Sequence, residues 1–392
     1  MVDRPVEREQ RVTPLELFFD LVVVFAITQV TELMSNDLSW RGLGRGLLVL
    51  AAIWWLWTGY AWLTNTLEPE EGIVRAGMFA AMAAMFLVAL SVPRAFGDEG
   101  VLFALAYLVV RLINLALYAI SGRGDPRLAR RLVRFATREM IAPVLILAAA
   151  FVDSPWREAL WVIALATVYS DVVFGRGREA TISPSHFAER YGLIVIIALG
   201  ESVVALGVSA AHSPLTPGVV SACILGILVI AALWWAYFDV LAVMTQRWLS
   251  QTSGGTQAQL ARDHYRYLHL PMIAGIVLFA LGLKETIEHV AEPLVTVPAV
   301  ALCGGLSLYF LTHVVQRVRL VYFLRHTTSD RPGYIGPGRL AAAVATLALI
   351  PAALEFPALA SLGLAAAVCC GLIAWDVIHY REDRVEVRRA RP

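Results

Sequence analysis

Four ionisable side chains fall inside or beside long apolar runs, where a charge needs a partner. Glu16 and Asp20 are four residues apart, so both face the same side of the first apolar helix. Arg111 lies midway along a later apolar run, one helical turn before Asn114. Glu201 lies about 14 residues, or roughly 21 Å, into another such run. A carboxylate at that depth must be paired, hydrated or protonated, so we interpret it as a functional group.

The same residues also have structural interpretations. The segment T-P-L-E at 13–16 forms a capping box, so capping the start of the helix is by itself a sufficient role for Glu16. Arg111 does not readily lose its proton and must meet an acid, carbonyl groups or water. Asp20 and Glu201 are its candidate acidic partners. Such a pair can fix helix packing as well as build a site, and both interpretations stay open.

Further acids lie near the helix ends of one membrane side, namely Asp171, Glu189, Asp239 and Asp376. Each alone is typical of an interfacial or packing residue. With Glu16 and Asp20 they predict an acidic vestibule opposite an arginine-rich rim. The four cysteines fall in apolar runs, and the sequence has no His-x₃-His motif or Cys/His cluster. We therefore assign no catalytic residue, no cofactor and no metal ligand.

The elements that must position these residues are membrane spans. The chain has 392 residues, of which 58% are hydrophobic and 16% charged, a composition too apolar for a soluble globular protein. Apolar runs of about 18 residues or more recur along it. We predict an all-α integral membrane protein with about twelve transmembrane helices. These spans cover 15–34, 46–65, 73–92, 101–120, 138–152, 157–174, 187–209, 218–244, 266–284, 296–317, 338–354 and 358–379.

The distribution of arginine and lysine predicts the orientation. Of the 32 basic residues, 26 lie in the N-terminus, the even-numbered loops and the C-terminus. Five lie in the odd-numbered loops, and Arg111 lies within a span. Cytoplasmic loops carry the excess of positive charge in membrane proteins, so both termini are predicted to be cytoplasmic.

The two halves of the chain resemble each other. The run 19–29 aligns with 191–201, which places Gln29 opposite Glu201. The second spans share the patterns A-A-I-W-W-L-W at 51–57 and A-A-L-W-W-A-Y at 231–237. We therefore predict two parallel six-helix repeats related by an axis along the membrane normal, as in parallel-repeat transporters. Because the aligned positions carry different charges, a site between the halves would lie off that axis.

This interpretation divides the chain into five parts. They are a cytoplasmic N-terminal segment (1–14), a first repeat (15–174), a cytoplasmic linker (175–186), a second repeat (187–379) and a basic cytoplasmic tail (380–392).

Two segments carry a resemblance to a known family. The runs T-P-L-E-L-F-F-D-L-V-V-V-F-A-I-T-Q at 13–29 and H-F-A-E-R-Y-G-L-I-V-I-I-A-L-G-E-S at 186–202 resemble the two signatures of the bacterial low temperature requirement protein A (LtrA) family. The spacing of the spans agrees along nearly the whole chain. The resemblance implies a multi-pass protein of the bacterial inner membrane, linked by name to growth in the cold. It implies no substrate and no residue roles.

A weaker similarity concerns ion channels. The aromatic-acid head of the first span is similar to the F-S-D motif of lysosomal and bacterial potassium channels built from six-helix repeats. Here Phe18, Phe19 and Asp20 replace F-S-D, and the second half has Tyr191 and Gly192 without an acid. That departure weakens the case for a symmetric pore, and the similarity is one of fold alone.

Three hypotheses about function remain. A transporter or channel for a small ion, a proton or a small solute is favoured by the buried acids and arginine. A membrane structural or sensor protein in cold or envelope adaptation would use the same charges for packing. An intramembrane enzyme acting on lipids is the least favoured. The predicted partner is the lipid bilayer, and nucleic acid is excluded because the arginines follow membrane topology. The sequence does not indicate an oligomeric state.

Overall fold

A computed structural model of the chain describes residues 12–67, 69, 72–121, 136–170, 182–324 and 337–380. Every regular element in these residues is a helix. Ten of the helices are long and apolar enough to cross a membrane, which takes about 20 residues. The prediction of a multi-pass, all-helical protein is therefore confirmed at this level.

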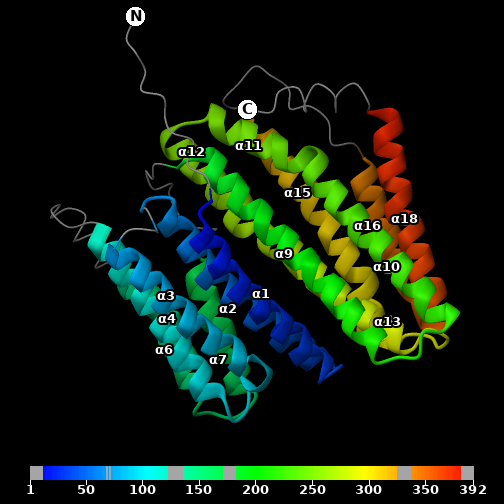
Figure 1. Ribbon diagram of the computed structural model, residues 1–392, viewed down its shortest axis with the longest axis horizontal. Helices are drawn as coiled ribbons and strands as arrows, with labels where there is room; N and C mark the ends of the chain where they lie inside the picture. Colours follow the sequence, from blue (N-terminus) through cyan, green and yellow to red (C-terminus); the bar gives the residue numbers. More distant parts are fainter. Residues whose placement is uncertain are drawn as a thin grey trace, which may run out of the picture.

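The helices form two groups that follow each other along the chain (Figure 1). The first contains α1 (Pro14–Ser35), α2 (Trp40–Thr64), α3 (Gly72–Ser91), η1 (Val92–Arg94), α4 (Gly100–Ser121), α6 (Ile141–Ala149) and α7 (Trp156–Tyr169). The second contains α9 (Pro184–Ala211), α10 (Pro217–Ala236), η2 (Tyr237–Leu241), α11 (Ala242–Gln251), α12 (Gly254–Ala261), η3 (Arg262–Tyr267), α13 (His269–Glu288), α14 (Thr296–Ala299), η4 (Val300–Gly304), α15 (Gly305–Leu324), α16 (Gly338–Ala348), α17 (Ile350–Glu355) and α18 (Ala358–His379).

The predicted fifth and sixth spans are helical where the structure describes them. At 138–152 a helix covers residues 136–139 and, after a turn at Met140, continues as α6 to Ala149. Within 157–174 the structure has α7, which ends at Tyr169, and residues 171–174 lie outside the described residues. The helices α6 and α7 pack on each other and against α4 and α2.

The predicted eighth span ends too early, and the predicted ninth span begins too late. The helix from Pro217 continues through η2 and α11 to Gln251, and the next begins at Gly254 and not at residue 266. Polar residues such as Arg247 and His264 lower the hydropathy of these ends, but the backbone stays helical. Three π-helical turns, η2, η3 and η4, lie in the second group, and such turns are frequent at functional sites.

Within each group the helices pack in a similar order. In the first group α1 contacts α2 and α3, α3 contacts α4, α4 contacts α6, and α2 and α6 contact α7. In the second group α9 contacts α10 and α13, α13 contacts α15, α15 contacts α16, and α10 and α16 contact α18.

The two groups meet along α1, which packs against α9 and α13, with a smaller contact between α2 and α13. Figure 1 shows α1 (blue) running beside α9 (green) along this seam. We call the contact of α1 with α9 and α13 the inter-group seam. The bundle end at which α1 begins is called the Pro14 end, and the opposite end is called the Ser35 end.

Glycine allows α13 to approach α15 and η4 closely. A Cβ added at Gly275 would lie 2.7 Å from the carbonyl oxygen of Gly305, and one added at Gly282 would lie 2.4 Å from the backbone nitrogen of Leu302. Because both neighbours are backbone atoms, a larger residue fits at neither position without moving a helix.

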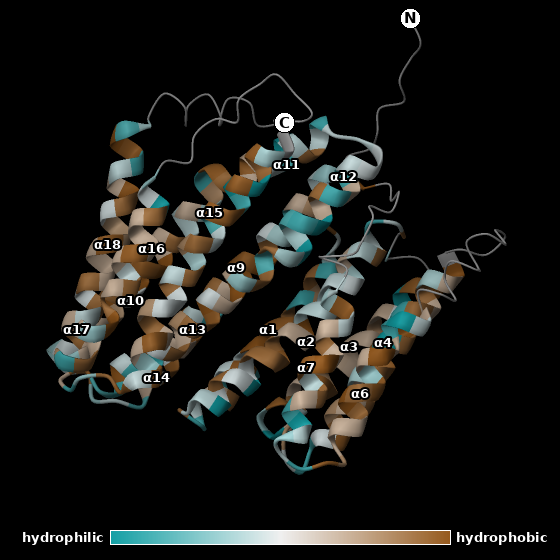
Figure 2. Cartoon of the chain, turned by 180° about the vertical axis from the view of Figure 1, so that it is seen from behind, coloured by the Kyte–Doolittle hydropathy of each residue, from teal (hydrophilic) through white to brown (hydrophobic). Residues whose placement is uncertain are grey.

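Apolar side chains also cover the outside of the bundle. Phe86, Ile224 and Val318 are 44%, 58% and 62% exposed, and many other large apolar residues share this environment. Figure 2 shows brown, apolar residues along most of the helices in both groups. A soluble protein rarely exposes so much contiguous apolar surface, whereas a bilayer covers it.

Candidate functional site

The first helix begins with the predicted capping box. The backbone N–H of Glu16 donates to the hydroxyl of Thr13 at 3.4 Å, and the backbone N–H of Thr13 donates to the Glu16 carboxylate at 2.9 Å. Pro14 occupies the first helical position, where a missing N–H is harmless. The structural interpretation of Glu16 as part of a cap is therefore correct.

Glu16 also faces α9 across the seam. Its Oε1 lies 3.0 Å from Nη1 of Arg190, and the ring of His186 lies 3.2 Å from its carboxylate. Nη2 of Arg190 donates to Oδ1 of Asp20 at 3.0 Å. All four side chains are buried. We call these residues, Glu16, Asp20, His186 and Arg190, the seam charge cluster; in it one guanidinium bridges two carboxylates.

The third helix of this contact is α2. Nε1 of Trp57 donates to Oδ1 of Asp20 at 2.8 Å, and the indole packs edge-on against Tyr191 with 4.9 Å between ring centroids. Trp57 is fully buried, as the mid-span position of the tryptophan pattern suggests. The hydrogen bond gives Asp20 a second fixed partner, and the ring contact with Tyr191 joins α2 to α9.

Arg190 was counted among the loop arginines, and the structure corrects this. It lies inside α9 and has no exposed surface. The predicted span 187–209 contains Arg190, but the charge count assigned this arginine to the preceding loop; a proline at the first helical position starts α9 at Pro184. A signal for the pairing is present in the sequence, because His186 and Arg190 have the same spacing of four residues as Glu16 and Asp20.

Arg111 meets neither of its predicted partners. Its Nη2 is hydrogen-bonded to Oε2 of Glu139, and its Nη1 donates to Oδ1 of Asn114 at 3.4 Å. The indole of Trp55 donates to the same Glu139 oxygen at 2.9 Å. The reason is packing: α4 contacts α2, α3 and α6 within the first group, whereas Asp20 and Glu201 lie at the seam. Glu139 was missed because it follows a run of arginines at a helix start.

Glu201 lies deep in the seam. It is 2% exposed, and its Oε2 accepts a hydrogen bond from the hydroxyl of Thr28 on α1. Gln29, which aligns with Glu201 in the sequence, directly follows Thr28 in α1 and is half-buried. Among the residues that the structure describes, no arginine, lysine or histidine forms an ion pair with Glu201. It therefore differs from every acid of the seam charge cluster.

The other predicted acids in the described residues belong to different helices. Glu189 is exposed and accepts from the backbone N–H of Val12 at 3.2 Å. Asp376 is paired with the buried Arg339 at 2.6 Å, and Asp239 is half-buried in η2. Asp171 lies outside the described residues. The described acids make separate contacts in separate helices, and the acidic vestibule stays a prediction.

Sequence reasoning also missed a buried group of histidines and tyrosines in the second group of helices. The hydroxyl of Tyr237 contacts Nε2 of His269 at 2.9 Å, and the hydroxyl of Thr245 contacts Nε2 of His264 at 2.9 Å. His313 is fully buried, and neither of its ring nitrogens has a hydrogen-bond partner in the described structure. These contacts lie around η2 and η3, where the helices contain π-helical turns.

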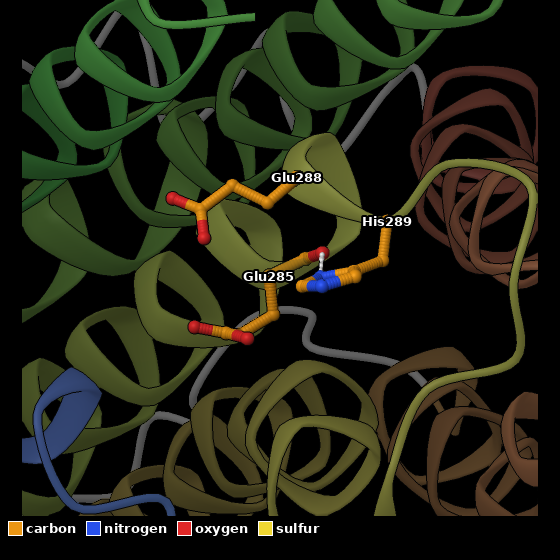
Figure 3. Close-up of side chains that lie close together, drawn as sticks. All are labelled: Glu285, Glu288 and His289. Carbon is orange, nitrogen blue, oxygen red and sulfur yellow. Dashed lines mark hydrogen bonds between the residues drawn. The ribbon is translucent and has the colours of Figure 1, made fainter.

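The Ser35 end of the seam carries the one lysine of the chain. Nζ of Lys284 on α13 donates to the hydroxyl of Ser35 at 2.7 Å and lies 3.4 Å from the carboxylate of Glu32. Just beyond it, Glu285, Glu288 and His289 converge at the end of α13 (Figure 3). One ligand atom from each of these three residues lies within 4.8 Å of the others, so they can hold a metal ion.

Two comparisons relate the sequence to known proteins. The sequence matches the family described as bacterial low temperature requirement A protein (LtrA) over residues 11–374. It is also similar to the protein named "Uncharacterized protein RA0937" of Rhizobium meliloti (strain 1021). The two are 31% identical over 286 residues, which cover 70% of this chain and 69% of that protein. The chain therefore belongs to the bacterial low temperature requirement A (LtrA) family.

Proposed function

We propose that the chain is a transporter or channel of the bacterial inner membrane that conducts a proton or another small cation along the inter-group seam. The proposal rests on the environment of Glu201. It is a carboxylate about 17 residues into a 28-residue helix, 2% exposed, with a threonine hydroxyl as its partner and no cation beside it in the described residues. A buried acid of this kind binds a proton or a cation in place of a fixed counter-ion.

Polar groups continue from Glu201 toward both ends of the seam. Toward the Pro14 end lies Asp20, whose buried Oδ2 has no hydrogen-bond partner in the described structure. It is eight residues before Thr28 on α1, about 12 Å along the helix axis. Toward the Ser35 end, Glu32 lies one turn beyond Thr28 and faces Lys284. Water between these groups would complete a path for a proton.

The packing pattern supports two repeats. Six contacts of the first group have a counterpart in the second group. They are those of α1 with α2 and α3, of α3 with α4, of α4 with α6, and of α7 with α2 and α6. The counterparts pair α1 with α9, α2 with α10, α3 with α13 and α4 with α15. In this proposal the seam lies between the first helices of the two repeats, where parallel-repeat transporters bind their substrates.

The same proposal gives an orientation. The Pro14 end faces the cytoplasm, because the predicted even-numbered loops carry most of the arginines. Arg190 and Arg339 are buried in ion pairs and no longer count as loop arginines. The excess of positive charge on the predicted cytoplasmic side remains without them.

The experiment is proton flux in liposomes that contain the purified protein, a potassium gradient with valinomycin, and an internal pH-sensitive dye. We expect acidification above that of protein-free liposomes, and we expect Glu201→Gln to remove it. Glu189→Gln is the matched control, because it changes an exposed acid of the same helix. Wild-type flux in Glu201→Gln would remove Glu201 from the pathway. If the wild type conducts neither protons nor alkali cations, the protein is not a transporter of this kind.

One observation favours a non-transporting structural protein as the second candidate. Arg111, Arg190 and Arg339 are buried, and each is paired with an acid. Pairs of this kind fix the packing of helices without any flux. Joint replacement of Arg111 and Glu139 by glutamine would then be tolerated better than either single replacement. The absence of flux in the liposome experiment distinguishes this candidate from the first.

A further inference from the structure

The end of α13 presents two acids and a histidine on one face. Glu285, Glu288 and His289 have helical spacings of three and four residues, which bring their side chains together (Figure 3). We propose that these three residues bind a divalent transition-metal ion such as Zn²⁺ at the Ser35 end. This site is separate from the pathway proposed above, and its test does not depend on flux.

Glu285 supplies the first reason. Its side chain is 94% buried, since only 6% of the residue is exposed, and its carboxylate has no hydrogen bond or ion pair with any described residue. Lys284 is its sequence neighbour but donates to Ser35 and pairs with Glu32 on α1. A largely buried carboxylate without a partner is unfavourable, because its charge is taken out of water with no compensating contact. A bound cation would supply that contact.

His289 supplies the second reason, through its tautomer. Its Nδ1 lies 3.3 Å from the backbone carbonyl oxygen of Glu285. Because a carbonyl oxygen only accepts, Nδ1 carries the proton, and Nε2 keeps a lone pair for a metal. Metal-binding histidines are commonly oriented by a hydrogen bond of this type from the other ring nitrogen.

The position at the helix end supplies the third reason. The last carbonyl groups of α13 carry the negative end of the helix dipole, which favours a cation near Glu288 and His289. The hydroxyl of Ser209 on α9 donates to Oε1 of Glu288 at 3.4 Å, so the exposed acid is also tied to the seam. Both Glu288 and His289 are exposed, so an ion can enter the site from outside the bundle.

The ligand set indicates the type of metal. Two carboxylates and one imidazole suit Zn²⁺ and similar first-row ions. Mg²⁺ prefers oxygen ligands and retains several waters, so it should bind much more weakly here. Three protein ligands leave at least one coordination position for water in a tetrahedral Zn²⁺ site.

The test is equilibrium binding of Zn²⁺ to the full-length protein in detergent, after removal of any polyhistidine tag, followed by calorimetry. We expect one Zn²⁺ per chain from this site in the wild type. Glu285→Gln and His289→Gln should each weaken that binding by more than about tenfold. Mg²⁺ should not compete with Zn²⁺ at comparable concentration.

Two matched controls separate the site from general surface binding. Glu292→Gln changes an exposed acid three residues after His289. His212→Gln changes an exposed histidine at the end of α9, whose Nδ1 also contacts a backbone carbonyl, that of Val208, at 2.8 Å. Both should bind Zn²⁺ as the wild type does.

Three results would overturn the proposal. They are unchanged Zn²⁺ affinity in His289→Gln, equal loss in the two controls, and equal affinity of the wild type for Mg²⁺ and Zn²⁺. Because His289 is exposed, its replacement does not disturb the core. Melting temperatures without metal show whether Glu285→Gln is folded, and His289→Gln decides the outcome if it is not.

Discussion

Buried acids at two places along the inter-group seam have different partners. At the Pro14 end, Glu16 and Asp20 meet Arg190, and Asp20 also accepts from Trp57. Deeper in the seam, Glu201 has a hydroxyl partner and no basic partner among the described residues. Paired acids hold helices together, whereas an acid without a counter-ion is available for exchange. The seam therefore contains a packing site and, in our proposal, a site for the conducted ion.

A second contrast separates the two groups of helices. Arg111 and Asn114 on α4 have the same spacing and sequence setting as His313 and Gln316 on α15. In the first group the arginine is paired with Glu139 from the next helix, whereas the ring of His313 has no hydrogen-bond partner in the described structure. The corresponding helix of the second group carries Arg339, which pairs with Asp376. Similar packing thus accommodates different charges.

The largest effect on stability is expected at the seam charge cluster. Arg190→Gln leaves Glu16 and Asp20 buried without a full counter-charge and should lower the free energy of unfolding by about 3–5 kcal/mol. Unfolding by dodecyl sulfate in mixed micelles measures this. The control is Arg94→Gln, whose partner Glu99 is at the surface and whose side chain is 69% exposed; it should lose less than about 1 kcal/mol. Equal stability of the two variants would contradict a packing role for the cluster.

A smaller effect is expected for the ion pair of the first group. Arg111→Gln leaves one buried acid, Glu139, without its partner and should cost about 3 kcal/mol in unfolding free energy. Adding Glu139→Gln should recover part of this loss, because the double variant buries no charge at this place. Additive losses in the same unfolding assay would mean that the two side chains act independently.

The hydrogen bond to Asp20 predicts a smaller loss again. Trp57→Phe removes the indole donor and should cost about 2 kcal/mol, since a buried charged acceptor loses one partner but keeps Arg190. Trp40→Phe serves as the control, because Trp40 is 60% exposed. A Trp57→Phe variant with the stability of Trp40→Phe would show that Arg190 alone compensates Asp20.

The smallest change in stability is expected at Glu201. Glu201→Gln keeps an oxygen that accepts from the Thr28 hydroxyl and removes a buried charge, so the unfolding free energy should change by less than about 1 kcal/mol. A loss as large as that of Arg190→Gln would mean that Glu201 is a structural residue, and the contrast along the seam would disappear.

The sequence allowed a good prediction of the helices and a partial one of the site. Hydropathy identified the apolar spans, and the capping box located the start of α1 correctly. Helix starts rich in polar residues were placed too late, at 187 instead of Pro184 and at 266 instead of Gly254, because hydropathy measures composition while backbone hydrogen bonds decide where a helix begins.

The partners of the buried charges were harder to predict than their existence. Burial required that Arg111 and Asp20 be paired, and both are. Which acid or base they meet depends on helix neighbours that are 28 residues away for Arg111 and 170 residues away for Asp20. Hydropathy contains no information on which helices touch. The matched spacing of Glu16 and Asp20 with His186 and Arg190 was the one signal that pointed to the seam.

The most direct test of the central claim is whether water reaches Glu201. In a background in which the four cysteines are replaced, Glu201→Cys should react with a water-soluble thiol reagent applied to either side of sealed vesicles. The thiolate, which needs water to form, is the reactive species. Glu189→Cys, at an exposed position of the same helix, is the positive control. Labelling of Glu201→Cys at a rate well above that of lipid-facing cysteines is the predicted result. No labelling of Glu201→Cys, together with full labelling of Glu189→Cys, would contradict a conducting path along the seam.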